Sequence, residues 1–92
     1  MKFLVEMEVT FPESLTPEQI ADFQAQEKEY SQKLQEGGEF EAIYRVVGRY
    51  ANVSIFEVDS NQRLHEILSG FPMYPYMDIR TTALCKHPNS IR

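Results

Sequence analysis

Apolar and charged residues alternate at the start of the chain. Over Lys2–Val9, apolar side chains occupy positions 3, 5, 7 and 9, and charged ones occupy 2, 6 and 8. A period of two predicts a strand with one buried face. The same reasoning predicts three further strands, which run over Phe40–Val47, Val53–Val58 and Met77–Leu84.

The second and third of these segments form a predicted hairpin, because only a short turn around Gly48 separates them. An unbroken alternation over Phe40–Val47 places the side chain of Phe40 on one face of the strand. It places Ile43 and Arg45 on the opposite face.

Two segments with helical signals separate the strands. Thr16 and Gln19 form a capping box around a proline at the first helical position, which predicts a helix over Pro17–Gln35. Ser60 caps a second helix that ends at Gly70. The order β-α-β-β-α-β predicts an α+β, ferredoxin-like fold, with two helices on one face of an antiparallel four-stranded sheet.

Length and charge narrow the function classes. The 92 residues predict one domain over 1–92, and the sheet face without helices predicts an oligomer that covers it. Residues 1–41 carry a net charge of −7 and residues 42–92 carry +2, so nucleic acid is an unfavourable partner. No apolar run reaches the roughly 20 residues of a membrane span, and no signal peptide is recognisable, which predicts a cytoplasmic protein. The single cysteine, Cys85, excludes an internal disulfide.

One carboxylate of the first helix falls within its apolar stripe. Ile20, Phe23, Tyr30 and Leu34 share an arc about 80° wide, and Glu27 falls inside it. Burial raises the pKa of a carboxyl group towards the range of a general base. The alternatives are that Glu27 reaches water at the edge of the stripe, or that it pairs with an arginine for structural reasons.

Four polar side chains lie close together around the predicted hairpin turn. Arg45, Arg49, Tyr50 and Asn52 offer two cations, a phenol and an amide, which suit a ligand with a carboxylate and a carbonyl. Taken singly, each is equally typical of an exposed strand or turn. The chain has no phosphate loop, dinucleotide fingerprint, nucleophile elbow or zinc-ligand spacing, which favours a reaction without metal or cofactor.

These residues lie within a pattern that resembles the muconolactone Δ-isomerase family over nearly the whole chain. The family includes chloromuconolactone dehalogenases. The matching segments are Glu27-Lys28-Glu29, Tyr44-Arg45, Tyr50-Ala51-Asn52, Leu64-His65, Phe71-Pro72-Met73-Tyr74-Pro75-Tyr76-Met77-Asp78-Ile79 and Leu84-Cys85-Lys86-His87-Pro88-Asn89-Ser90-Ile91.

The resemblance implies a specific reaction and assembly. It implies a ferredoxin-like homodecamer with active sites at subunit contacts. It also implies a cofactor-free conversion of muconolactone to 3-oxoadipate enol-lactone in the β-ketoadipate pathway of aromatic degradation. The acid/base glutamate of the family corresponds to Glu27. We expect Asn52 or Tyr50 to stabilise the dienolate oxygen, and Arg45 or Arg49 to bind the acetate side chain of the substrate.

Other functions remain open at this point. The family pattern has histidine before Tyr50, where this chain has Arg49, so a dehalogenase or a relative that acts on, or only binds, another acidic lactone is an alternative. A non-catalytic ligand-binding or assembly module, or a small oxygenase of the dimeric α+β barrel type, would have the same fold.

Overall fold

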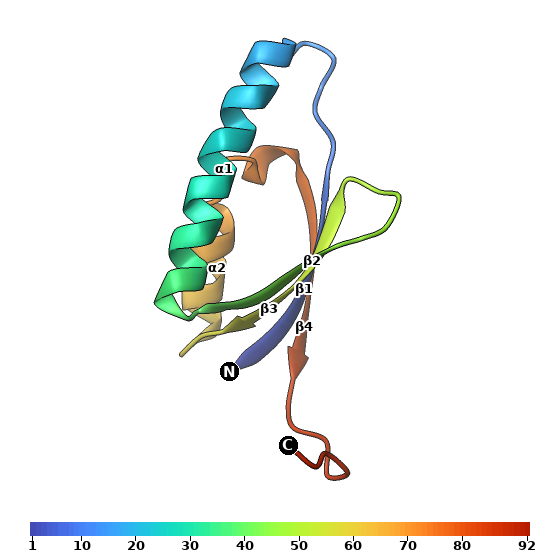
Figure 1. The fold of residues 1–92 in the computed structure, drawn as a ribbon. Helices are drawn as coiled ribbons and strands as arrows, with labels where there is room; N and C mark the ends of the chain where they lie inside the picture. The colour runs from blue at the N-terminus through green and yellow to red at the C-terminus, as the bar shows by residue number, and fades with distance from the viewer.

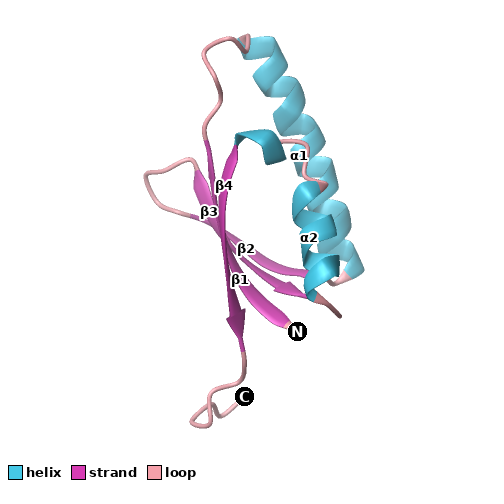
Figure 2. Cartoon of the chain, turned by 180° about the vertical axis from the view of Figure 1, so that it is seen from behind, coloured by secondary structure: helices cyan, strands magenta, loops and turns pink.

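The four strands form one antiparallel sheet in the order β2-β3-β1-β4, and both helices lie on one side of it (Figures 1 and 2). This arrangement confirms the ferredoxin-like fold. The computed structural model describes residues 1–92. Its elements are β1 (Lys2–Val9), α1 (Pro17–Gly37), β2 (Phe40–Arg45), β3 (Ala51–Glu57), α2 (Asn61–Ser69), a 3-10 turn (Tyr74–Tyr76) and β4 (Met77–Leu84).

The ends of α1 follow the local sequence. The Thr16 hydroxyl accepts a hydrogen bond from the Gln19 N–H at 3.1 Å, and the Gln19 side chain accepts one from the Thr16 N–H at 2.9 Å. The predicted capping box is therefore present. The helix ends at Gly37, two residues beyond the predicted end at Gln35, and Gly38 follows it in a left-handed conformation with φ of 91°.

The core lies between the sheet and α2. Phe3, Val5 and Met7 of β1 pack in one cluster with residues of α2, among them Ile67 and Leu68. By contrast, α1 has no fully buried residue, although Tyr30 and Leu34 pack against this cluster. Helix α2 therefore packs tightly on one part of the sheet. The part of the sheet that only α1 covers is packed less tightly, which leaves room for a pocket between α1 and the sheet.

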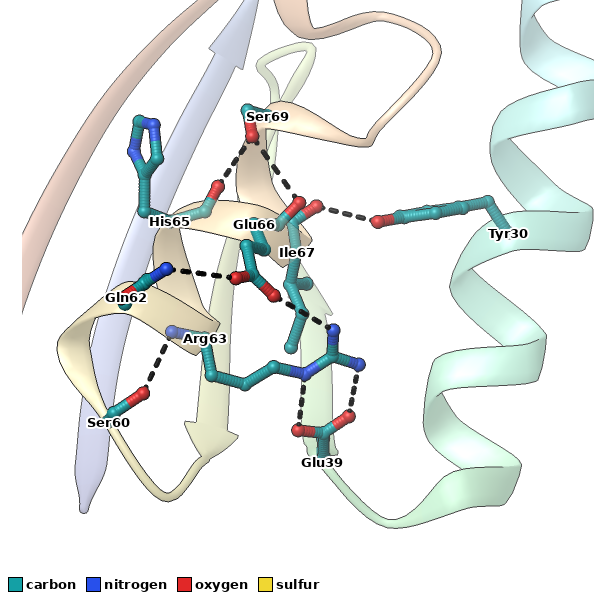
Figure 3. Close-up of polar contacts among 9 residues, drawn as sticks. All are labelled: Tyr30, Glu39, Ser60, Gln62, Arg63, His65, Glu66, Ile67 and Ser69. Atoms are coloured by element: carbon teal, nitrogen blue, oxygen red, sulfur yellow. Dashed lines mark hydrogen bonds and ion pairs between the residues drawn. The ribbon is translucent and has the colours of Figure 1, made fainter.

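Polar contacts hold α2 to its neighbours (Figure 3). The Tyr30 hydroxyl of α1 donates to the backbone oxygen of Ile67 at 2.7 Å. The Arg63 guanidinium donates two hydrogen bonds to the Glu39 carboxylate, at 2.9 and 2.7 Å, just before β2 begins. These contacts fix the spacing of α1, α2 and the first residue of β2.

A β-bulge overturns the predicted faces of β2. Phe40 lies opposite Phe56 and Arg45 lies opposite Asn52, so one extra residue of β2 stands between Phe40 and Ala42. The extra residue reverses the alternation beyond it. The prediction that Arg45 points away from the face of Phe40 was therefore wrong: both side chains lie on the helix side of the sheet.

The hairpin turn lies two residues earlier in the chain than the alternation predicted. β2 ends at Arg45 rather than Val47, and β3 begins at Ala51 rather than Val53. The Val46 N–H donates to the Ala51 oxygen at 3.0 Å, which closes the turn. Residues 46–50 thus form a loop that projects past the ends of β2 and β3 (Figure 1).

None of the helices is long and apolar enough to cross a membrane.

Candidate active site

A pocket of about 330 Å³ lies between α1, the sheet and the segment before β4. Apolar residues of all four strands line it, with Met77 as the contribution of β4, and its polar lining residues come from α1, β2, β3 and the turn before β3. Its polar lining residues are Gln24, Glu27, Lys28, Ser31, Arg45, Tyr50 and Asn52, and its apolar ones include Met7, Phe40, Ile43, Phe71, Met73 and Met77.

Glu27 occupies the position that the helical period predicted. It is half-buried on the sheet-facing stripe of α1 and lines the pocket. Its Oε1 accepts a hydrogen bond from the backbone N–H of Met73 at 2.9 Å, so one carboxylate oxygen is fixed in place. Burial raises the pKa of Glu27, and the hydrogen bond from Met73 only partly offsets this rise.

Arg45 and Tyr50 lie against each other beside the pocket. The guanidinium carbon of Arg45 lies 5.2 Å from the centre of the Tyr50 ring, within the range of a cation–π contact. None of the ion pairs of the chain involves Arg45. The Tyr50 hydroxyl accepts a hydrogen bond from the Gln24 side chain at 3.1 Å, which leaves its own proton available to donate. The pair therefore offers a cation and a hydroxyl donor to an anionic ligand.

Arg49 lies elsewhere. Its Nη2 forms an ion pair with Glu8 at 2.6 Å, and Glu8 points to the sheet face without helices. Arg49 lines a separate hollow of about 280 Å³ on that face, together with Arg80 and Asp78. The structure thus brings together Glu27, Arg45, Tyr50 and Asn52, but not Arg49.

Several residues in or beside the pocket were missed by the sequence reasoning. Gln24 and Ser31 lie three and four residues from Glu27, so the helical period was a sufficient signal for them, whereas Lys28 directly follows Glu27 in the chain. Ser54 follows Asn52 at the strand period of two and donates to its side chain at 2.8 Å. The Met73 backbone contact joins residues 46 positions apart and had no sequence signal.

The arrangement suits proton transfer on a small anionic molecule. A carboxyl group of raised pKa faces a pocket that also presents an amide, a phenol and unpaired cationic side chains. No group of three histidine, cysteine, aspartate or glutamate side chains is arranged to hold a metal ion.

Comparisons with known proteins agree with this geometry. The sequence profile of muconolactone delta-isomerases matches residues 1–90. Muconolactone Delta-isomerase of Cupriavidus pinatubonensis is 51% identical over the full length of both chains, and that of Acinetobacter baylyi is 48% identical over all of this chain and 96% of its own. The crystal structure of a muconolactone isomerase superposes with a TM-score of 0.95 at 42% identity, over 100% of this chain and 96% of that one. The chain therefore belongs to the muconolactone delta-isomerase family.

Proposed function

We propose that this protein isomerises muconolactone to 3-oxoadipate enol-lactone, with Glu27 as the acid/base residue. The observation that carries the proposal is the half-buried Glu27 carboxyl group, which has a raised pKa and faces a pocket of about 330 Å³. The names of the relatives favour this reaction over the dehalogenation of a chlorinated lactone.

The reaction needs one proton to move between two ring carbons. Glu27 takes the proton from the ring carbon at the far end of the conjugated system. The electron pair of the broken C–H bond is then delocalised through the ring onto the lactone carbonyl oxygen. The resulting dienolate collapses, the double bond shifts, and the carbon next to the carbonyl takes the proton back from Glu27. A single carboxyl group serves both steps if the ligand is held within its reach. No electron acceptor or cofactor is required for this balance.

The other pocket residues have separate roles in the proposal. The Asn52 amide or the Tyr50 hydroxyl donates to the dienolate oxygen, where negative charge develops. Arg45 binds the acetate carboxylate of the substrate, because its guanidinium has no ion-pair partner within the chain. Arg49 is a poorer candidate within one chain, because Glu8 already neutralises it on the other sheet face.

The test is turnover of muconolactone, followed by its absorbance change, with wild type and Glu27→Gln. We expect kcat to fall about 10²–10⁴-fold, the usual contribution of a general acid/base. Glu29→Gln is the matched control, since Glu29 lies on the exposed side of the same helix and pairs with Lys33. Equal rates for wild type and Glu27→Gln would remove Glu27 from the mechanism. No turnover by wild type would remove muconolactone as the substrate.

We further propose that the protein acts in the cytoplasm as a homo-oligomer, namely the homodecamer that the family resemblance implies. Leu4, Val53 and Ile55 are only half-buried on the sheet face without helices, and Tyr44 is 66% exposed. A second copy would remove this apolar surface from water. Sedimentation equilibrium measures the subunit count, and a monomer at micromolar concentration would contradict the proposal.

A further inference from the structure

We propose that Ser54 is a positioning residue, which orients the Asn52 side chain so that its amide N–H groups face the substrate oxygen. The inference rests on the proposed function, in which Asn52 donates to the dienolate. Ser54 itself is not among the residues that line the pocket.

Ser54 is an unusual residue for its place in the sheet. It is the only buried polar residue of the chain, with 0% of its surface exposed. Its neighbours across the two adjacent strands, Val5 of β1 and Ile43 of β2, are both apolar. A small apolar residue would fill this position without burying a hydroxyl group, so packing alone does not explain the serine.

The Ser54 hydroxyl has a single side-chain partner. Its Oγ lies 2.8 Å from Oδ1 of Asn52, and the two side chains share the helix-facing side of β3 because they are two residues apart. The hydroxyl proton needs an acceptor at this buried position, and Oδ1 provides it.

This bond decides which end of the amide faces the pocket. If the Asn52 amide were reversed, its nitrogen would donate to Oγ, and the buried Ser54 proton would be left without an acceptor. In the observed orientation no group of the chain accepts a hydrogen bond from the Asn52 amide nitrogen, so its N–H bonds remain available to a ligand in the pocket that Asn52 lines together with Glu27. A donor held in this way before the substrate arrives stabilises developing charge without having to reorient.

The main experiment is a double-mutant cycle on muconolactone turnover with Ser54→Ala, Asn52→Ala and the double variant. We expect Asn52→Ala to lower kcat about 10²-fold or more. Ser54→Ala should lower kcat about 10-fold with little change in KM. In the Asn52→Ala background, Ser54→Ala should change kcat less than about twofold. An equal loss in both backgrounds, or an unchanged kcat for Ser54→Ala, would overturn the inference.

Val5→Ala is the matched control for simple loss of packing. Val5 lies directly opposite Ser54 and is equally buried, but its side chain cannot form a hydrogen bond with Asn52. It should lower the unfolding midpoint and leave kcat unchanged. If Val5→Ala lowers kcat as much as Ser54→Ala, the effect of Ser54 is structural and the inference fails.

A structural measurement keeps the two proposals separable. In neutron crystal structures of wild type and Ser54→Ala, which distinguish the amide nitrogen from the oxygen, we expect one ordered Asn52 orientation in the former, and a rotated or divided one in the latter. If wild type does not turn over muconolactone, the proposed function fails, and this comparison still decides whether Ser54 orients Asn52. The same single Asn52 orientation in both proteins would refute the role of Ser54.

Discussion

Replacing Glu27 by glutamine tests how much the half-buried Glu27 carboxylate lowers the free energy of unfolding. The substitution removes the charge and nearly preserves the volume. It also keeps an oxygen that can accept a hydrogen bond from the Met73 N–H, which lies 2.9 Å from Oε1 in the wild type. Burial is the larger of the two effects on Glu27 and raises its pKa, whereas the hydrogen bond from Met73 lowers it. The folded protein therefore binds the Glu27 proton more tightly than the unfolded chain does.

The sign of the stability change follows from this shift. Because the folded-state pKa of Glu27 is raised, the free energy of unfolding contributed by this group falls as pH rises from the unfolded to the folded value. Below about pH 4.3, the unfolded value, the group is neutral in both states, and wild type and Glu27→Gln should differ little. At pH 7.5 the variant should be more stable by about 0.5 kcal/mol, a small figure because solvent screens a half-buried charge and a neutral acceptor bonds more weakly.

The assay is thermal unfolding followed by circular dichroism at pH 4 and pH 7.5, at one protein concentration because association shifts apparent stability. A gain of 0.5 kcal/mol corresponds to a melting temperature about 2–4 °C higher for a chain of this size. Glu29→Gln, which loses an exposed pair with Lys33 at 3.3 Å, should instead be unchanged or less stable by about 0.3–0.5 kcal/mol. A Glu27→Gln variant that is less stable than wild type at pH 7.5, or equally stabilised at both pH values, would refute the reasoning.

Two further predictions concern an arginine and an ion pair. Arg45→Met should raise KM for muconolactone about 10–100-fold with a smaller change in kcat, because a charge-assisted bond to the acetate group is lost; steady-state kinetics check this, and Arg80→Met on the open sheet face should leave KM unchanged. The hydrogen bonds from Arg63 lower the pKa of Glu39, so this pair stabilises the fold above about pH 4.3 and that contribution is lost as pH falls further. Glu39→Gln should therefore lower the urea midpoint of unfolding at pH 7, and this midpoint should fall less between pH 5 and pH 3 than it does in the wild type. An equal fall of the midpoint in both proteins would contradict this role.

The candidate site was partly readable from the sequence. Glu27 was found because the side-chain period of a helix is a local property, and an acid within an apolar stripe stands out without any knowledge of its partners. Tyr50 and Asn52 were found as polar groups near a turn. Arg49 has the same local character as Arg45, and nothing in the sequence shows that it pairs with Glu8, 41 residues away.

Local sequence patterns were sufficient to predict the order of the elements, the capped start of α1 and the stripe that carries Glu27, because these depend on contacts within a few residues. The tertiary structure decided which side chains meet. One extra residue between Phe40 and Ala42 turns Arg45 to the helix side, since a strand reverses its faces with every single-residue shift. The Met73 N–H reaches Glu27 only when the chain folds back before β4. The site therefore depends on strand register and chain return, which local patterns of hydrophobicity do not record.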